Sequence, residues 1–190
     1  MKKYLILLFG FLVFSGCDLT TSEGTLDNRE KIEVFKAPDP ITMLKKINEI
    51  RKTPRNCQDG LGVVGPVDPL QWNEELYKSS KEHSYDMAMS NMFSHKGSGG
   101  KYDITGKKRA KKSLFYERIE ENGYLYSATK GENLATGIYD FDKVLASWLK
   151  SPYHCSNIMY SSFSDVAIAI STNEKSTNGI YWTQDFGEKD

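Results

Sequence analysis

Apolar residues recur at helical spacing in several stretches of this chain. In Ile41–Arg51 an apolar side chain falls at every third position, and Phe141–Leu149 carries apolar residues at positions i, i+3, i+4 and i+7. Asn73 is a favourable N-cap, because its side chain can accept hydrogen bonds from the first backbone amides of a helix, and it predicts a helix over Glu74–Asn91. A further helix is expected over Lys107–Asn122.

Proline and glycine mark the expected breaks between these helices. Cys57–Pro69 is rich in both and is predicted to be a loop, and Gly97–Gly106 is predicted to be a flexible break. Pro152 is expected to close the helix before it, which puts His154 just beyond that helix.

The hydrophobic period changes near the C-terminus. Phe163–Ser171 alternates apolar and small residues, and Ile180–Phe186 is rich in aromatic and β-branched residues, with a turn-rich connection over Thr172–Gly179. This pattern predicts an antiparallel β-hairpin. Helices followed by a terminal hairpin indicate an α+β fold, in which helices pack on a small, mostly antiparallel sheet.

The N-terminus is typical of a bacterial lipoprotein signal. Lys2 and Lys3 precede an apolar stretch that ends in Ser15-Gly16-Cys17, so we expect removal of residues 1–16 and lipidation of Cys17. An ordinary secretory peptide is the alternative. Residues 17–37 are polar and predict a tether, and residues 38–190 predict one domain. The expected location is the cell envelope, outside the cytoplasm, with the membrane reached through the lipid on Cys17.

The charge balance argues against a nucleic-acid-binding protein. The whole chain has 25 basic and 25 acidic residues, and losing Lys2 and Lys3 leaves 23 against 25, a formal charge of −2. Six of the basic residues form a cluster, which is expected to be a solvated face or, alternatively, a contact with anionic envelope polymer or lipid headgroups. Its members are Lys101, Lys107, Lys108, Arg109, Lys111 and Lys112.

Cys57 and Cys155 are the two thiols left once Cys17 is assigned to lipid. An exported protein meets an oxidising compartment, which favours a disulfide between them. The alternative is a catalytic thiol, because Cys155 directly follows His154.

The chain has three histidines, and two of them form the candidate site together with one glutamate. His83 and Asp86 lie one turn apart on a predicted helix, so His83 is expected to pack or hydrogen-bond along that helix and to stay outside the site. His95, Glu132 and His154 are expected at loop–helix junctions, which suits a cleft. Two imidazoles and a carboxylate also suit a Zn²⁺ site with an open position, although their spacing matches no local metal motif.

Six short motifs, in order along Ile41–Gly187, resemble the CAP superfamily of cysteine-rich secretory proteins, antigen 5 proteins and plant pathogenesis-related proteins, also called SCP-like domains. The resemblance is greatest to the bacterial branch. The motifs are Leu70–Asn73, His83–Ala88, Phe93–His95, Gly131–Gly137, Trp148–Met159 and Tyr181–Gly187.

The resemblance implies an α-β-α sandwich with a central cleft that often holds two histidines and two glutamates and in some members binds a divalent metal. By motif these residues fall on His95, Glu132 and His154, whereas Ser151 stands at the position of the other glutamate. Because a hydroxyl cannot replace a carboxylate as a charged ligand or base, weak binding of a cation such as Zn²⁺ is expected. The resemblance also supports the pairing of Cys57 with Cys155.

These observations favour a monomeric binding module for an extracellular or envelope ligand. A hydrolase is the first alternative, with His95, Glu132 and His154 as the candidate catalytic residues and Ser94 or Ser151 as a variant nucleophile. The second alternative is a carrier of lipid or sterol.

Overall fold

A four-stranded sheet forms the middle layer of the computed structural model, which describes residues 35–126 and 129–189. The strand order is β3-β5-β6-β4. β5 (Asp165–Thr172) and β6 (Ile180–Gly187) form the predicted antiparallel hairpin, and the short β3 (Gln71–Trp72) runs parallel to β5. β4 (Lys130–Thr136) pairs with β6 and was not predicted as a strand; it places Glu132 in the sheet rather than in a loop before a helix.

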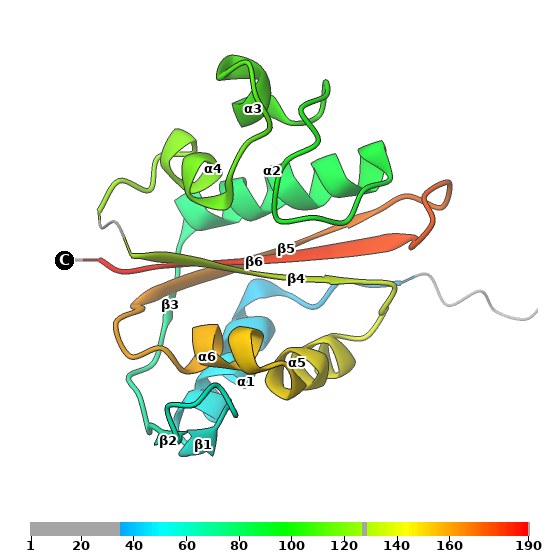
Figure 1. Cartoon of the computed structure of the whole chain (residues 1–190). Coiled ribbons are helices and arrows are strands. Elements are labelled where there is room, and N and C mark those ends of the chain that lie inside the picture. The colour runs from blue at the N-terminus through cyan, green and yellow to red at the C-terminus, as the bar shows by residue number, and fades with distance from the viewer. Residues whose placement is uncertain (1–34, 127–128, 190) are drawn as a thin grey trace, which may run out of the picture. The chain divides into compact units, whose positions relative to one another are not determined.

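One face of the sheet is covered by α2 (Glu74–Ser90), with α4 (Phe115–Glu121) and α3 (Ile104–Lys108) farther out (Figure 1). Asn73 caps α2 as predicted, since its side chain accepts hydrogen bonds from the backbone amides of Glu75 and Leu76.

The predicted continuous helix over Lys107–Asn122 was wrong, because the chain breaks between α3 and α4. Ala110 adopts a left-handed backbone conformation with φ of 52°, which interrupts a helix. The preceding stretch is also more ordered than the predicted flexible break. The buried carboxylate of Asp103 accepts hydrogen bonds from the backbone amides of Gly99, Gly106 and Ser113, and so holds this loop in one compact turn.

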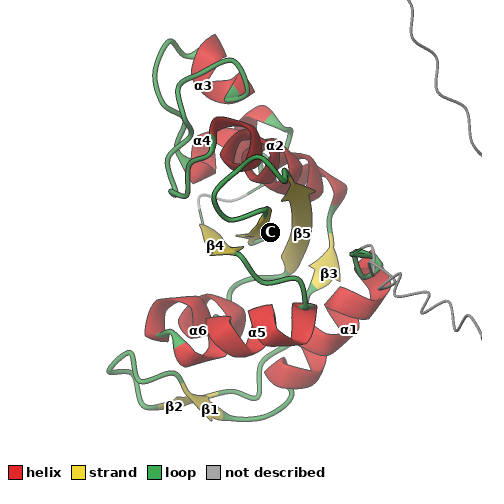
Figure 2. Cartoon of the chain, turned by 90° about the vertical axis from the view of Figure 1, so that its right-hand side faces the viewer, coloured by secondary structure: helices red, strands yellow, loops and turns green. Residues whose placement is uncertain are grey.

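The opposite face is covered by α1 (Pro40–Arg51), α5 (Phe141–Lys150) and α6 (Pro152–Met159), so that the sheet lies between two helical layers (Figure 2). The structure thus confirms an α+β fold of α-β-α type. The prediction that Pro152 ends a helix was incomplete: Pro152 also starts α6 at a position where its missing N–H is not needed. His154 therefore lies inside a helix.

The main core lies between the sheet and α1, α5 and α6. Ile47, Trp148, Ile158, Trp182 and Phe186 are all nearly or fully buried there. Burial of side chains of this size, each worth about 2–3 kcal/mol, stabilises the packing of these helices on the sheet.

Two connections join α1 and the loop that follows it to α6 and the residues just after α6. Cys57 and Cys155 form the predicted disulfide, which ties the loop around β1 (Arg55–Asn56) and β2 (Val63–Val64) to the helix. The buried guanidinium of Arg51 donates hydrogen bonds to backbone carbonyl groups of residues 68, 158, 160 and 163. Within the described ranges, none of the helices is long and apolar enough to cross a membrane.

Candidate functional site

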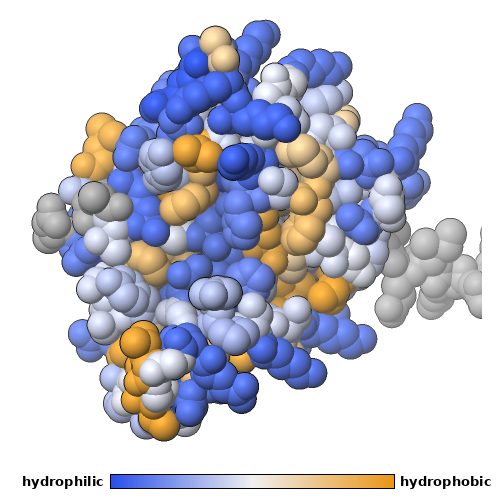
Figure 3. Space-filling view, in the orientation of Figure 1, coloured by the Kyte–Doolittle hydropathy of each residue, from blue (hydrophilic) through white to orange (hydrophobic). Residues whose placement is uncertain are grey.

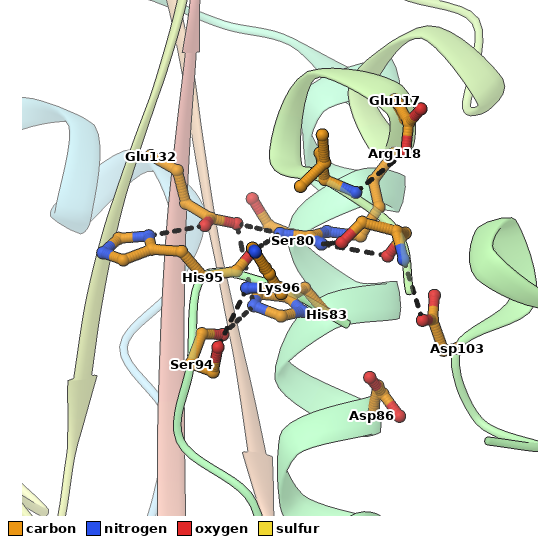
Figure 4. A network of polar contacts seen from close by, with 12 residues as sticks. Ser80, His83, Asp86, Ser94, His95, Lys96, Asp103, Glu117, Arg118 and Glu132 are labelled. Atoms are coloured by element: carbon orange, nitrogen blue, oxygen red, sulfur yellow. Dashed lines mark hydrogen bonds and ion pairs between the residues drawn. The ribbon is translucent and has the colours of Figure 1, made fainter. Parts of the chain in front are cut away.

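Glu132 is the centre of a polar cluster between the sheet and the helices α2 and α4. Its side chain is 1% exposed, yet both carboxylate oxygens have partners (Figure 4). Nδ1 of His95 lies 2.8 Å from Oε1, and Nη2 of Arg118 donates to Oε2 at 2.6 Å. The predicted pair His95 and Glu132 is therefore in direct contact, and Arg118 is a third member that was not among the predicted site residues.

Arg118 also holds the loop that carries His95. Its Nη2 donates to the backbone carbonyl of His95 at 3.1 Å, and its Nη1 donates to Oγ of Ser113 at 3.0 Å. The same guanidinium thus fixes both the carboxylate of Glu132 and the backbone of the residue that contacts it. A lone arginine among the apolar residues of α4 was the signal for this role.

The charge of Arg118 decides the ionisation of Glu132. Burial alone would raise the pKa of this carboxyl group, but Arg118 above all, followed by His83 and His95, lowers the pKa to about 2. Glu132 is consequently ionised at neutral pH. A carboxylate of such low basicity, with both oxygens already bound, is a poor general base.

His83 lies in this cluster, contrary to the prediction that it would stay outside it. Its side chain is fully buried, Nε2 is 2.8 Å from the backbone carbonyl of Ser94, and the same nitrogen is 3.9 Å from Oε2 of Glu132. Asp86 is not its partner, because the carboxylate of Asp86 accepts hydrogen bonds from the backbone amide and hydroxyl of Ser98. Burial lowers the pKa of His83 to about 4 despite the nearby charge of Glu132, so this imidazole is neutral at pH 7.

Asp185 is the second buried carboxyl group of the cluster and was not among the predicted site residues. It lies directly opposite Glu132 in the β4–β6 ladder, which puts both side chains on the same face of the sheet. Burial and the charge of Glu132 raise the pKa of Asp185 well above its usual range, while Arg118 and the hydroxyls of Ser79 and Ser80 act in the opposite direction. Neither of its oxygens has a hydrogen-bond partner of good geometry. A charged residue in the aromatic strand Ile180–Phe186 was the sequence signal.

The two other predicted histidines differ in environment. The side chain of His95 is 55% exposed, so its Nε2 is available on the side away from Glu132. His154 is half-buried, and burial, followed by the neighbouring charge of His95, lowers its pKa.

A second network, on the other face of β4, holds the helix of His154 in place. The side-chain amide of Asn133 donates to the backbone carbonyl of His154 at 3.1 Å and to Oε1 of Gln184 at 3.0 Å. Asn157 of α6 donates in turn to the side-chain oxygen of Asn133 at 2.9 Å. Because Glu132 and Asn133 are adjacent in one strand, β4 links both histidines.

The fit of this cluster to a metal ion can be judged from the oxygen atoms of Glu132. Both accept short hydrogen bonds, so using either as a ligand would require it to leave Arg118 or His95. In the part of the chain that the structure describes, no group of three or more His, Cys, Asp or Glu side chains is arranged to hold a metal ion. Ser151, at the position of the missing glutamate, is the N-cap residue of α6 and its side chain makes no capping hydrogen bond.

The model of the cysteine-rich secretory protein family, CAP, matches residues 44–186. The chain belongs to the CAP family. It is 28% identical over 170 residues to the uncharacterized protein YkwD of Bacillus subtilis, with a match that covers 88% of this chain and 56% of that protein. This CAP chain therefore spans little more than half the length of that relative.

Solved structures share the fold at low sequence identity. An outer surface protein of Borrelia burgdorferi has a TM-score of 0.56 at 19% identity, over 79% of this chain and 92% of that one. An extracellular protein of Bacillus anthracis that contains an SCP domain has a TM-score of 0.54 at 18% identity, over 81% of this chain and 45% of that one. These similarities agree with the α-β-α architecture.

Proposed function

We propose that this CAP domain is a binding module that is anchored outside the cytoplasm by lipid on Cys17 and recognises an envelope or extracellular ligand through His95 and His154. The observation that carries this proposal is the double engagement of Glu132 by His95 and Arg118. The carboxylate is a fixed structural charge behind His95, which leaves the exposed imidazole as the group that can meet a ligand.

The hydrogen bond that His95 donates to Glu132 gives this imidazole a defined orientation. A carboxylate that accepts from Nδ1–H keeps this proton on Nδ1, so that Nε2 presents a lone pair or, once protonated, a second N–H to solvent. Such an imidazole can bind an anionic or hydroxyl-rich group or coordinate a cation. His154 supplies a second imidazole beside it.

Any Zn²⁺ at this site would rest on His95 and His154, with Glu132 supporting His95 from behind as carboxylates commonly do for ligating histidines. Two protein ligands are fewer than the three or four of known zinc sites, which supports weak and reversible binding. The location is supported by the Ser15-Gly16-Cys17 junction and by the surface and extracellular proteins with the same fold.

Calorimetry with Zn²⁺ on the wild type, His95→Ala, His154→Ala and Glu132→Gln tests the site. We expect weak Zn²⁺ binding in the wild type, loss of binding in both histidine variants, and only a reduction of the affinity in Glu132→Gln. Lys150→Ala is the control, because it replaces an exposed side chain on the neighbouring helix α5. A melting-temperature screen against isolated envelope polymers tests the binding role, because a ligand stabilises the folded state by mass action.

A hydrolase is the second candidate, because a carboxylate–histidine pair with a free Nε2 is also the arrangement of an oriented general base. We expect no turnover of casein, peptidoglycan or simple esters. Robust turnover that vanishes in His95→Ala would make the enzyme the better assignment.

A further inference from the structure

A groove away from the histidine cluster lies between α2, α3 and α4. It has a volume of about 400 Å³, within the range of small-ligand pockets. One wall is a single face of α2, because Lys78, Lys81, Glu82 and Tyr85 are spaced at i, i+3, i+4 and i+7. The second wall comes from α3 and the third from the end of α4, which stand over α2 in Figure 1.

The apolar part of the groove is exposed to solvent. Figure 3 shows that apolar and polar side chains are mixed on the face of the molecule seen in Figure 1. Ile104 of α3 is 53% exposed and Tyr85 of α2 is 46% exposed, although both are large apolar side chains. The ring of Tyr85 meets Tyr102 edge to face at 5.6 Å between centroids. A further aromatic ring on Tyr85 would extend this pair.

The charges around the groove do not balance internally. Both oxygens of Glu82 accept hydrogen bonds, from the backbone amide of Thr105 at 2.7 Å and from the side chain of Asn122 at 2.9 Å. Glu121 pairs with Lys108, and Arg109 lies 3.9 Å from its other oxygen.

Lys78 and Lys81, by contrast, have no ion-pair partner among residues 35–126 and 129–189. Glu82 keeps its negative charge because both of its donors are neutral, so the three lysines and two glutamates that line the groove leave a net charge of +1 beside its apolar floor. A bound anion would find these charges on the rim while its apolar part covered Ile104 and Tyr85.

We propose that this groove binds a small aromatic anion, with the ring on Tyr85 and Ile104 and the acidic group between Lys78 and Lys81. The site is separate from the histidine cluster, and its ligand does not depend on the function proposed above. Exposed charge pairs of this kind contribute little each, so the apolar contact supplies most of the affinity and the lysines select for an anion.

Fluorescence titration of the full chain with anilinonaphthalene sulfonate, an aromatic anion, and with the uncharged dye phenylnaphthylamine tests this. We expect the sulfonate to bind more tightly. The double variant Lys78→Ala/Lys81→Ala should weaken sulfonate binding about fivefold and leave the neutral dye unchanged. Tyr85→Ala should weaken the binding of both dyes.

The matched control is Lys143→Ala/Lys150→Ala, which removes two lysines from a depression on α5 that has no large apolar side chain in its lining. The control variant should leave the binding of both dyes unchanged. Because both double variants are made in the same protein, dye that binds elsewhere contributes equally to each titration and does not affect the comparison. Equal binding of the two dyes to the wild type, or equal losses in the two double variants, would overturn the assignment. All substituted side chains are exposed or half-buried, and circular dichroism verifies that each variant is folded.

Discussion

The pKa shifts of His83 and Asp185 have opposite directions and predict an unusual pH dependence of stability. Both side chains are fully buried, and burial disfavours the charged form of each. In the folded state His83 therefore lacks a proton down to about pH 4, and Asp185 keeps its proton well above its usual range. In the unfolded chain both groups titrate normally.

The window to examine lies between pH 4.5 and pH 6.5. The lower limit is the ordinary pKa of Glu, above which Glu132 is ionised in both the folded and the unfolded state, and the upper limit is the ordinary pKa of His. There, His83 binds a proton only in the unfolded state, so the free energy of unfolding rises by about 1.4 kcal/mol per pH unit. Because burial raises the pKa of Asp185, this group binds more protons in the folded than in the unfolded state, which lowers the free energy of unfolding as the pH rises, by at most the same amount per pH unit. The two contributions oppose each other, so the wild type should show a smaller slope from this cluster than His83 alone would give.

Single substitutions separate the two contributions. Asp185→Asn resembles the protonated acid and leaves His83 alone, so its free energy of unfolding should gain up to about 2–3 kcal/mol between pH 4.5 and pH 6.5 relative to the wild type. His83→Gln leaves Asp185 alone and should lose a similar amount over the same interval. Urea denaturation at five pH values measures both slopes.

Asp142→Asn is the control, because Asp142 is 66% exposed and should not change the slope in this window. An Asp185→Asn slope equal to that of the wild type would show that Asp185 is ionised in the folded protein. In that case the assignment of a buried, protonated acid beside Glu132 would be refuted.

Three further predictions follow from other contacts. Cys57→Ser should lower the free energy of unfolding by about 4–5 kcal/mol, since the bridge spans 98 residues; urea denaturation measures the loss, and a wild type that is unaffected by reductant would contradict it. Cys17→Ala should abolish incorporation of labelled palmitate, and persistent labelling would exclude lipidation at this cysteine. Arg51→Lys should cost at least about 2 kcal/mol, because lysine cannot reach four separate carbonyl groups; Lys45→Arg on the same helix is the control.

Elements with regular apolar spacing could be predicted from the sequence. The helices now seen as α1, α2 and α5 and the hairpin β5–β6 follow the periods of a helix and a half-buried strand. β4 could not be predicted in this way, because Gly131, Glu132 and Asn133 are buried within it and interrupt the apolar pattern. α6 was hidden because proline serves equally as the end of one helix and the first residue of the next.

The candidate site was predictable only where a motif carried it. His95 and Glu132 stand in recognisable motifs, and the structure joins them at 2.8 Å. Arg118 and Asp185 meet Glu132 through the packing of α4 and through the β4–β6 register. Both depend on contacts between segments far apart in the chain, about which local spacing carries no information.

Because the other members of the cluster are buried, a ligand can contact the cluster only through the exposed side chain of His95. The carboxylate of Glu132 is balanced by Arg118, His83 is neutral at pH 7, and burial raises the pKa of Asp185, because burial disfavours the charged form of each group. Any further charge placed in this interior would lack a partner, which makes it a poor place for a cation or for proton transfer. A ligand must therefore approach from the solvent side. There the carboxylate of Glu132, which is paired with Arg118, fixes the orientation of His95.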